Sequence, residues 1–175
     1  MIEKAKRVRI LILDVDGVMT DGGLICSSKG EEGKVFNVRD GLGIALLLRE
    51  NIKVAIISGR KSEAVEHRAR ELGIQEVYQG VKDKVAAFEE ILKKEKITPD
   101  QVGFIGDDLV DLPLLSRVGF AVGVADAAEE VKESVDYVTR HTGGKGAVRE
   151  VCELILKSQE KWEKLLSALK SYREP

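Results

Sequence analysis

The stretch LILDVDGVMTDGG, residues 11–23, ends an apolar run on two acidic residues. Asp14 and Asp16 are separated by one residue, and Gly17 follows directly. Two ionised carboxylates at the end of a buried segment need a compensating cation or a shared proton. Either this pair lies in a solvated loop or a positively charged group belongs beside it. The residues of the remaining chain distinguish these two possibilities.

Composition describes a globular protein with one domain spanning residues 1–175. Hydrophobic residues make up 43% of the chain and charged residues 33%, and the formal net charge is -2. This charge gives no basic surface for nucleic acid or for an anionic membrane. Two distant cysteines, Cys26 and Cys152, do not make a disulfide framework. Since the chain shows no signal peptide and no apolar run of membrane length, we expect a cytoplasmic protein.

Short buried strands alternate along the chain with amphipathic helices, which predicts an α/β fold with a parallel sheet and helices on both faces. Strands are expected where short apolar runs occur, at 8–13, 53–58, 74–79, 101–106, 119–124 and 136–140. Helices are expected from helical spacing and capping residues, at 40–51, 62–73, 83–96, 107–118, 126–134 and 146–172. Asp40 is a candidate N-cap for the first of these helices.

Residues 22–41 have no helical period and interrupt this alternation. They predict a β-hairpin inserted after the first strand, with strands at 24–28 and 34–38 around the turn 29–33. A hairpin at this point would stand above the carboxyl end of the sheet. It is either a decorative loop or a flap or assembly element. Apolar residues unusual for so exposed a place favour the second interpretation: Leu24, Ile25, Val35, Phe36 and Val38.

Polar side chains follow four of the predicted strands at the point where each ends. In open α/β sheets, ligands bind outside the carboxyl ends of the strands, so these groups are expected on one rim. In chain order the residues are Asp14 and Asp16; Ser58, Gly59 and Arg60; Lys82 and Lys84; and Asp107, Asp108 and Asp111. A single such motif occurs often by chance, whereas four in order point to a site.

The residue types on this rim suit phosphoryl transfer. Crowded carboxylates favour Mg²⁺, which binds carboxylates, water and a substrate phosphate. One aspartate can attack phosphorus to form an aspartyl-phosphate, and a second, two residues on, can serve as general acid and base. The Ser58 hydroxyl and backbone N–H groups near Gly59 can hold phosphoryl oxygens, and a lysine adds a fixed positive charge.

Four segments resemble the signatures of the haloacid dehalogenase superfamily of phosphatases: DVDGVMTDG, ISGR, QGVKDK and GDDLVD. Longer phrases, including FNVRDGLGI and VTRHTGGKGAVREVCELIL, are similar in order and spacing to the small phosphatases of 3-deoxy-D-manno-octulosonate 8-phosphate. The resemblance covers nearly the whole chain. It implies a Rossmann-like core without a large cap domain, Mg²⁺ dependence, and a homotetramer whose hairpins pack together and whose neighbouring subunits help close each site. It further implies a cytoplasmic route that makes sugar acid for a bacterial outer-membrane lipopolysaccharide.

This resemblance assigns the acidic residues. Asp14 matches the nucleophile, which also binds the metal, and Asp16 matches the general acid and base, with its backbone carbonyl on the metal. Asp107 matches the acidic metal ligand of the fourth signature. Asp108 and Asp111 are expected to orient ligands and to pair with the lysine from behind.

The resemblance also assigns the phosphate-binding groups. Ser58 matches the hydroxyl of the second signature. Lys84, rather than Lys82, matches the lysine of the third, which stands at the start of a helix. Exchange of Lys84 is therefore expected to cost more activity than exchange of Lys82.

Recognition of the sugar acid is predicted at two places. Arg60, beside Gly59, could bind a carboxylate bidentately, although a surface arginine at a turn is the alternative. The glycine-rich, basic segment 141–150 precedes a helix and could meet an anion through Lys145 and Arg149, or could be a flexible joint.

Three alternatives remain open from the residues alone. A nine-carbon sugar-acid 9-phosphate would use the same catalytic residues. A receiver-like signalling domain also forms an aspartyl-phosphate, although its usual arrangement has no place for Ser58 or for GDDLVD. A catalytically silent binding module would have to hold five acids at this rim without using them, which is costly.

Overall fold

The computed structural model describes residues 1–28 and 32–171. Its described strands include a six-stranded sheet of order β5-β4-β1-β6-β7-β8, in which every neighbouring pair is parallel. The strands are β1 Ile10–Leu13, β4 Lys53–Ser58, β5 Glu76–Gln79, β6 Val102–Gly106, β7 Phe120–Gly123 and β8 Tyr137–Val138. The predicted α/β class is confirmed, and each of the six strands predicted for the sheet is present within a few residues of its expected ends.

The central strand β1 is buried along its whole length, which explains its continuous apolar sequence. Its residues pair on one side with β4 and on the other with β6, so that Leu13 lies opposite both Ile56 and Ile105. Beyond the strand, the Asp14 backbone N–H still donates to the Ile105 carbonyl at 3.1 Å. The acids that follow β1 are thereby brought beside the residues that follow β6.

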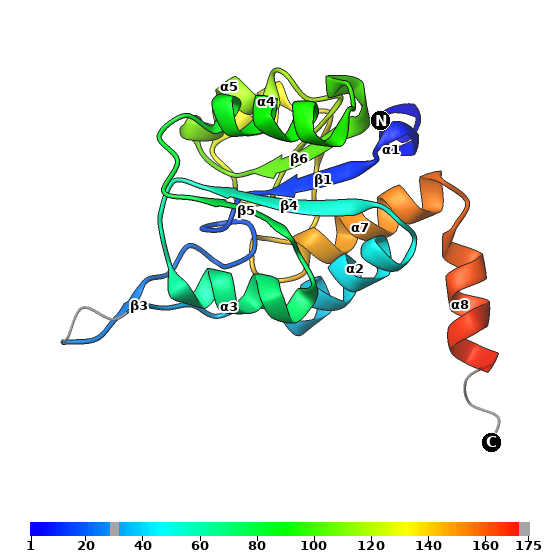
Figure 1. The fold of residues 1–175 in the computed structure, drawn as a ribbon, viewed down its shortest axis with the longest axis horizontal. Helices are drawn as coiled ribbons and strands as arrows, with labels where there is room; N and C mark the ends of the chain where they lie inside the picture. The colour runs from blue at the N-terminus through cyan, green and yellow to red at the C-terminus, as the bar shows by residue number, and fades with distance from the viewer. Residues whose placement is uncertain (29–31, 172–175) are drawn as a thin grey trace.

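Helices cover both faces of the sheet (Figure 1). One face carries α2 Val38–Arg49, α3 Glu63–Leu72 and α7 Ala147–Ser158, and α1 Ile2–Arg7 packs against α7. The opposite face carries α4 Lys84–Glu95 and α5 Leu112–Leu115, with α6 Glu129–Ser134 beside α5. Two 3₁₀ turns, Pro99–Gln101 and Leu109–Asp111, complete the connections. Among the described residues, no helix is both long and apolar enough to cross a membrane.

The predicted hairpin projects from the body of the protein (Figure 1), but its second strand is misplaced in the prediction. The antiparallel strands are β2 Ile25–Cys26 and β3 Glu32–Gly33, of two residues each. Part of the predicted turn, residues 29–31, lies outside the described residues. The apolar residues Val35, Phe36 and Val38 suggested a strand at 34–38, but this segment leads into α2, which begins at Val38.

The first predicted helix begins two residues earlier than expected, because Asn37 and not Asp40 is its N-cap. The Asn37 side chain accepts a hydrogen bond from the Arg39 backbone N–H at 2.8 Å. Asp40 is buried and accepts instead from the backbone N–H groups of Gly146 and Arg149, at 3.3 and 2.7 Å. A carboxylate of α2 therefore fixes the first turn of α7.

The prediction of one long helix over 146–172 is wrong. Helix α7 ends at Ser158, and a separate helix α8, Trp162–Ser171, leaves the body at a new angle (Figure 1). At the break Glu160 has a left-handed φ of 58°, and the Lys161 N–H bonds back to the Leu156 carbonyl at 2.9 Å. This pattern ends a helix and is usually formed by glycine, so the sequence carries no ordinary signal for it. Tyr172 lies outside the described residues.

Candidate active site

A cavity of about 390 Å³ opens at the carboxyl ends of the central strands and is called the cleft from here on. Most of the predicted site residues line it: Asp14, Asp16, Ser58, Gly59, Arg60, Lys82, Lys84, Asp107 and Asp108. These residues come from four separate segments of the chain, each following a strand of the parallel sheet. The topology therefore gathers the four polar clusters on one rim, as the strand ends predict.

Lys84 lies at the centre of the cleft and compensates two of its acids. Its Nζ donates to Asp14 Oδ1 at 2.7 Å and to Asp111 Oδ1 at 2.6 Å, and its side chain is only 9% exposed. The neighbouring Asp83 caps α4 by accepting from the Val85 N–H at 2.9 Å, which makes Lys84 the first helical residue. Lys82 is exposed, and within residues 1–28 and 32–171 no acidic partner is found for it.

Asp111 is fully buried and both of its oxygens are engaged. While Oδ1 accepts from Lys84, Oδ2 accepts from the backbone N–H groups of Asp107 and Asp108, at 3.0 and 3.4 Å. Asp111 therefore orients the lysine and the loop that carries Asp107. Asp14 and Asp107 are the other two carboxylates of this cluster.

The acidic cluster fits a divalent cation. Carboxylate oxygens of Asp14, Asp107 and Asp111 lie within 4.8 Å of one another. Gly17 adopts a φ of 91°, and a Cβ atom there would stand 2.0 Å from Asp107 Oδ2, so glycine leaves room for that carboxylate. Hard oxygen donors at this spacing suit Mg²⁺. The Asp16 carboxylate is paired elsewhere, so only its backbone carbonyl would serve as a ligand, as the resemblance implies.

Burial and mutual repulsion raise the pKa values of Asp14 and Asp107. Burial, partly offset by Lys84 and reinforced by Asp111, raises the pKa of Asp14 from 3.8 to about 6. Burial also raises the pKa of Asp107 to about 8, and the negative charges of Asp14, Asp111 and Asp108 add to this effect. The acids that end the apolar run therefore do lie beside a positive charge, but the single ammonium of Lys84 does not balance the negative charge of the cluster.

Ser58 ends β4 and is almost completely buried. Its Oγ accepts from the Arg60 backbone N–H at 3.3 Å, and its carbonyl accepts from the Val81 N–H at 3.2 Å. This tight turn holds the hydroxyl at the cleft and ties the loop after β4 to the loop after β5. The arrangement suits the binding of phosphoryl oxygens.

The hairpin brings a residue into the site that the sequence did not predict. Lys34, whose side chain is 1% exposed, donates to Asp16 Oδ1 and pairs with Glu32 Oε1 at 2.8 Å. Burial lowers the pKa of Lys34, but its bonds to the two acids outweigh that effect, so the pKa is raised and the ammonium is retained. Arg60 Nη2 donates to Glu32 Oε2 at 2.7 Å, and its Nε lies 3.8 Å from Asp16 Oδ2.

Lys145 and Arg149 do not line the cleft. They line a separate cavity of about 600 Å³ with Arg39, Arg140 and Lys157. Lys145 Nζ lies 3.4 Å from Asp21 Oδ2, and Arg149 donates to Glu153 Oε1 at 2.8 Å. Within one chain these two residues and Asp14 line different cavities, so contact of Lys145 and Arg149 with substrate stays a prediction.

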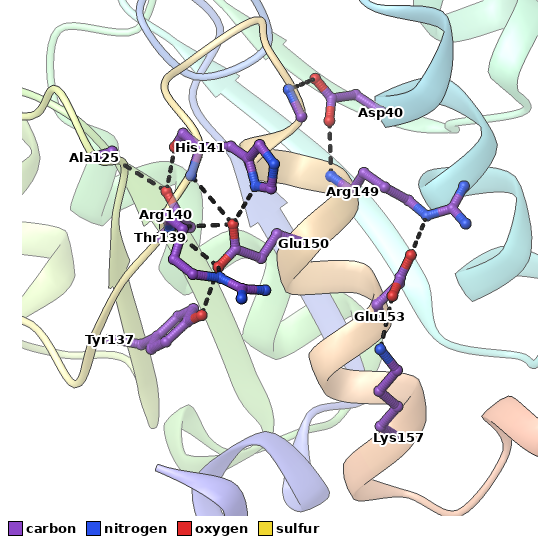
Figure 2. Close-up of polar contacts among 11 residues, drawn as sticks. Asp40, Ala125, Tyr137, Thr139, Arg140, His141, Arg149, Glu150, Glu153 and Lys157 are labelled. Atoms are coloured by element: carbon purple, nitrogen blue, oxygen red, sulfur yellow. Dashed lines mark hydrogen bonds and ion pairs between the residues drawn. The ribbon is translucent and has the colours of Figure 1, made fainter.

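Glu150 shapes the loop beside that second cavity (Figure 2). Its carboxylate accepts from the Tyr137 hydroxyl at 2.6 Å and from the backbone N–H groups of Arg140 and His141, at 3.1 and 3.2 Å. Burial opposes ionisation, yet these donors lower the pKa of Glu150 to about 2. The glycine-rich segment 141–146 is therefore pinned at both ends, by Glu150 and by Asp40, and is not a free joint.

The chain is similar in sequence to known phosphatases. Residues 74–151 match the family model of haloacid dehalogenase-like hydrolases. The chain is 51% identical over 163 residues to the 3-deoxy-D-manno-octulosonate 8-phosphate phosphatase KdsC of Yersinia pestis, covering 93% of this chain and 87% of that protein. The enzyme of the same name from Escherichia coli K12 is 52% identical over 161 residues, covering 92% and 86%.

One protein of similar structure has been solved with ligands bound. The crystal structure of 3-deoxy-D-manno-octulosonate 8-phosphate phosphatase from Moraxella catarrhalis contains a magnesium ion, a phosphate ion and a KDO molecule. It matches this chain with a TM-score of 0.94 and 43% identity, covering 96% of this chain and 97% of that one.

The raised pKa values predict how Mg²⁺ stabilisation depends on pH. Between about pH 4 and pH 8 Asp14 and Asp107 bind more protons in the folded, metal-free protein than in the unfolded chain, so their contribution to the free energy of unfolding falls as pH rises. Protons also compete with Mg²⁺ for the two carboxylates, and this competition weakens over the same range. The melting temperature with Mg²⁺ minus that with chelator should therefore grow from pH 5 to pH 8. At a hundredfold excess over Kd, the gap should reach about 5–10 °C.

The matched control for this measurement is Asp107→Asn. It removes one ionisable ligand and should flatten the dependence of the gap on pH. A gap in the unaltered protein that stays constant or shrinks as pH rises would show that these carboxylates do not hold the cation.

Proposed function

The chain belongs to the 3-deoxy-D-manno-octulosonate 8-phosphate phosphatase family of haloacid dehalogenase-like hydrolases, and from this premise we propose that it hydrolyses that sugar phosphate to the free sugar acid and inorganic phosphate. One observation carries the proposal at the level of the site. The acids after β1 and β6 meet in one cleft around Lys84, beside the Ser58 hydroxyl. The chemistry of these groups is a phosphoryl transfer to an aspartate and then to water.

In the first step Asp14 is the nucleophile. Lys84 holds its Oδ1, which leaves Oδ2 to attack phosphorus. The bond from phosphorus to the sugar oxygen breaks while Asp16 donates a proton to that oxygen, so the sugar leaves as an alcohol. In the second step a water molecule attacks the phosphoryl group, Asp16 takes its proton, and Asp14 is restored with release of phosphate.

The phosphoryl group is held by groups that remain fixed throughout. The Ser58 hydroxyl, the N–H groups at Gly59 and the Lys84 ammonium stabilise its oxygens as charge develops. Magnesium, held by the carboxylates of Asp14 and Asp107 and by the Asp16 carbonyl, would supply further positive charge against the phosphate. Asp108 and Asp111 act from behind these groups by fixing the loop and the lysine.

The carboxylate of the sugar acid is proposed to bind Arg60, at the mouth of the cleft. In this structure Arg60 pairs with Glu32 of the hairpin, so a substrate carboxylate would replace Glu32 as its partner. Bidentate pairing with a guanidinium is specific for planar anions of this kind. Lys145 and Arg149 are proposed to contact the substrate only in the assembled protein, where neighbouring subunits would help to close each cleft.

The assembly is proposed to be a homotetramer. Large apolar side chains are exposed on the hairpin and at the start of α2: Leu24, Ile25, Val35, Val38 and Leu42. A monomer in water rarely exposes so many neighbouring apolar groups. The proposed compartment is the cytoplasm, where the exposed free thiol of Cys26 stays reduced.

The first test is phosphate release from a panel of sugar phosphates, with Mg²⁺ and with excess chelator. We expect release that requires Mg²⁺ and prefers 3-deoxy-D-manno-octulosonate 8-phosphate over a nine-carbon sugar-acid 9-phosphate. A preference for the nine-carbon acid would overturn the substrate but keep the mechanism. Absence of release from every ester would overturn the phosphatase and favour a phospho-aspartate signalling domain or a silent binding module.

A pair of lysine variants tests the role of the central ammonium. Lys84→Ala leaves Asp14 and Asp111 buried without their cation, so it should lower kcat by about 10²–10³-fold. Lys82→Ala removes an exposed side chain from the same loop and should cost less than about tenfold. The reverse order would show that the third signature is aligned two residues out of place.

A further inference from the structure

Lys34 contacts the proposed general acid and base from behind. Its ammonium bonds to Asp16 Oδ1, and its side chain is 1% exposed. Asp16 lines the cleft, whereas Lys34 lines a separate hollow with Phe36 and His67. The lysine therefore touches the catalytic carboxylate without facing the place where substrate binds.

This contact makes the two oxygens of Asp16 different. Oδ1 is engaged by Lys34, while Oδ2 lies 3.8 Å from Nε of Arg60, a residue that lines the cleft. The terminal torsion of an aspartate is broad, so an unanchored carboxylate samples many orientations. An ammonium with almost no exposed surface selects one orientation and leaves one defined oxygen for proton transfer.

We propose that Lys34 is a positioning residue, which orients Asp16 so that Oδ2 exchanges the proton with the leaving-group oxygen. The proposal rests on the proposed phosphatase function and adds to it a role for the hairpin. Lys34 itself touches neither the substrate nor the phosphoryl group. It acts through Asp16, and it links the hairpin that carries it to the chemistry of the cleft.

A positioning role for the proton donor predicts a dependence on the leaving group. A sugar alkoxide leaves poorly unless it is protonated, whereas 4-nitrophenolate leaves without a proton. Loss of Lys34 should therefore lower kcat/KM for the sugar phosphate and spare kcat/KM for an activated ester. This ratio covers the steps through departure of the leaving group and not the second step, in which Asp16 acts whichever substrate was used. A purely structural role would lower both rates together.

The experiment compares Lys34→Met with the unaltered protein on two substrates, 3-deoxy-D-manno-octulosonate 8-phosphate and an activated ester. The activated ester is 4-nitrophenyl phosphate or acetyl phosphate, whichever the unaltered protein hydrolyses. For the sugar phosphate kcat/KM should fall about 10–100-fold, and for the activated ester kcat/KM should change less than about threefold. Lys34→Arg, which keeps a charged donor, should recover most of the lost rate. Should Lys34→Met fail to fold, Lys34→Gln is measured instead, with a smaller loss in the same direction.

Two further variants separate this role from anchoring of the hairpin. Glu32→Gln weakens the other ion pair of Lys34 but leaves the contact with Asp16, so its ratio of sugar-phosphate to activated-ester kcat/KM should not fall below that of the unaltered protein. Lys94→Met removes an exposed lysine that pairs with Glu76. Neither residue lines the cleft, so this variant should leave both rates unchanged.

The outcomes are distinct. Equal losses on both substrates in Lys34→Met, or the same selective loss in Glu32→Gln, would overturn the positioning role. An unaltered protein that hydrolyses no phosphate ester would overturn the proposed function instead, before any variant is compared.

Discussion

The buried ammonium of Lys84 is the interaction on which the site depends. It lies between Asp14 and Asp111, which come from the ends of two different strands, and it is the only cation that pairs with them among the described residues. Removing two acids from water costs more than one ion pair returns, and Asp107 adds a third negative charge nearby. The cluster is therefore left with excess negative charge that suits a divalent cation, and the cation in turn suits a phosphate.

The hairpin extends the same pattern of alternating charge outward from the sheet. Lys34 separates the acids Asp16 and Glu32, and Arg60 in turn bonds to Glu32. Asp16 and Glu32 thus each have a cationic partner, whereas no ion pair of Asp107 is found among the described residues. This division places the unbalanced charge where the metal is proposed to bind and the exchangeable partners where the substrate would enter.

The sequence predicts the sheet and the rim well because both follow from local patterns. Buried strands read as apolar runs, and chain order then brings their carboxyl ends together, so the cleft residues follow from the strand assignments. The break between α7 and α8 was missed because Glu160 takes a left-handed conformation without a glycine. Lys34 was missed because a lysine in a short exposed hairpin normally faces water, and only tertiary contact with Asp16 buries it. Lys145 and Arg149 illustrate a further limit, since a basic loop in sequence does not tell which cavity it will border.

The most direct test of this account is to locate the phosphoryl group during turnover. Protein mixed with 3-deoxy-D-manno-octulosonate 8-phosphate and Mg²⁺ is quenched in acid within the first turnover, digested, and mapped by mass spectrometry. An Asp16→Asn variant is measured in parallel with acetyl phosphate or 4-nitrophenyl phosphate, whose leaving groups need no proton, so that the exchange slows only the breakdown of the intermediate. The account predicts an acyl-phosphate on Asp14 in both proteins, more abundant in the variant. Phosphate on Ser58 or Asp107, or direct transfer to water with no labelled peptide in either protein, would contradict it.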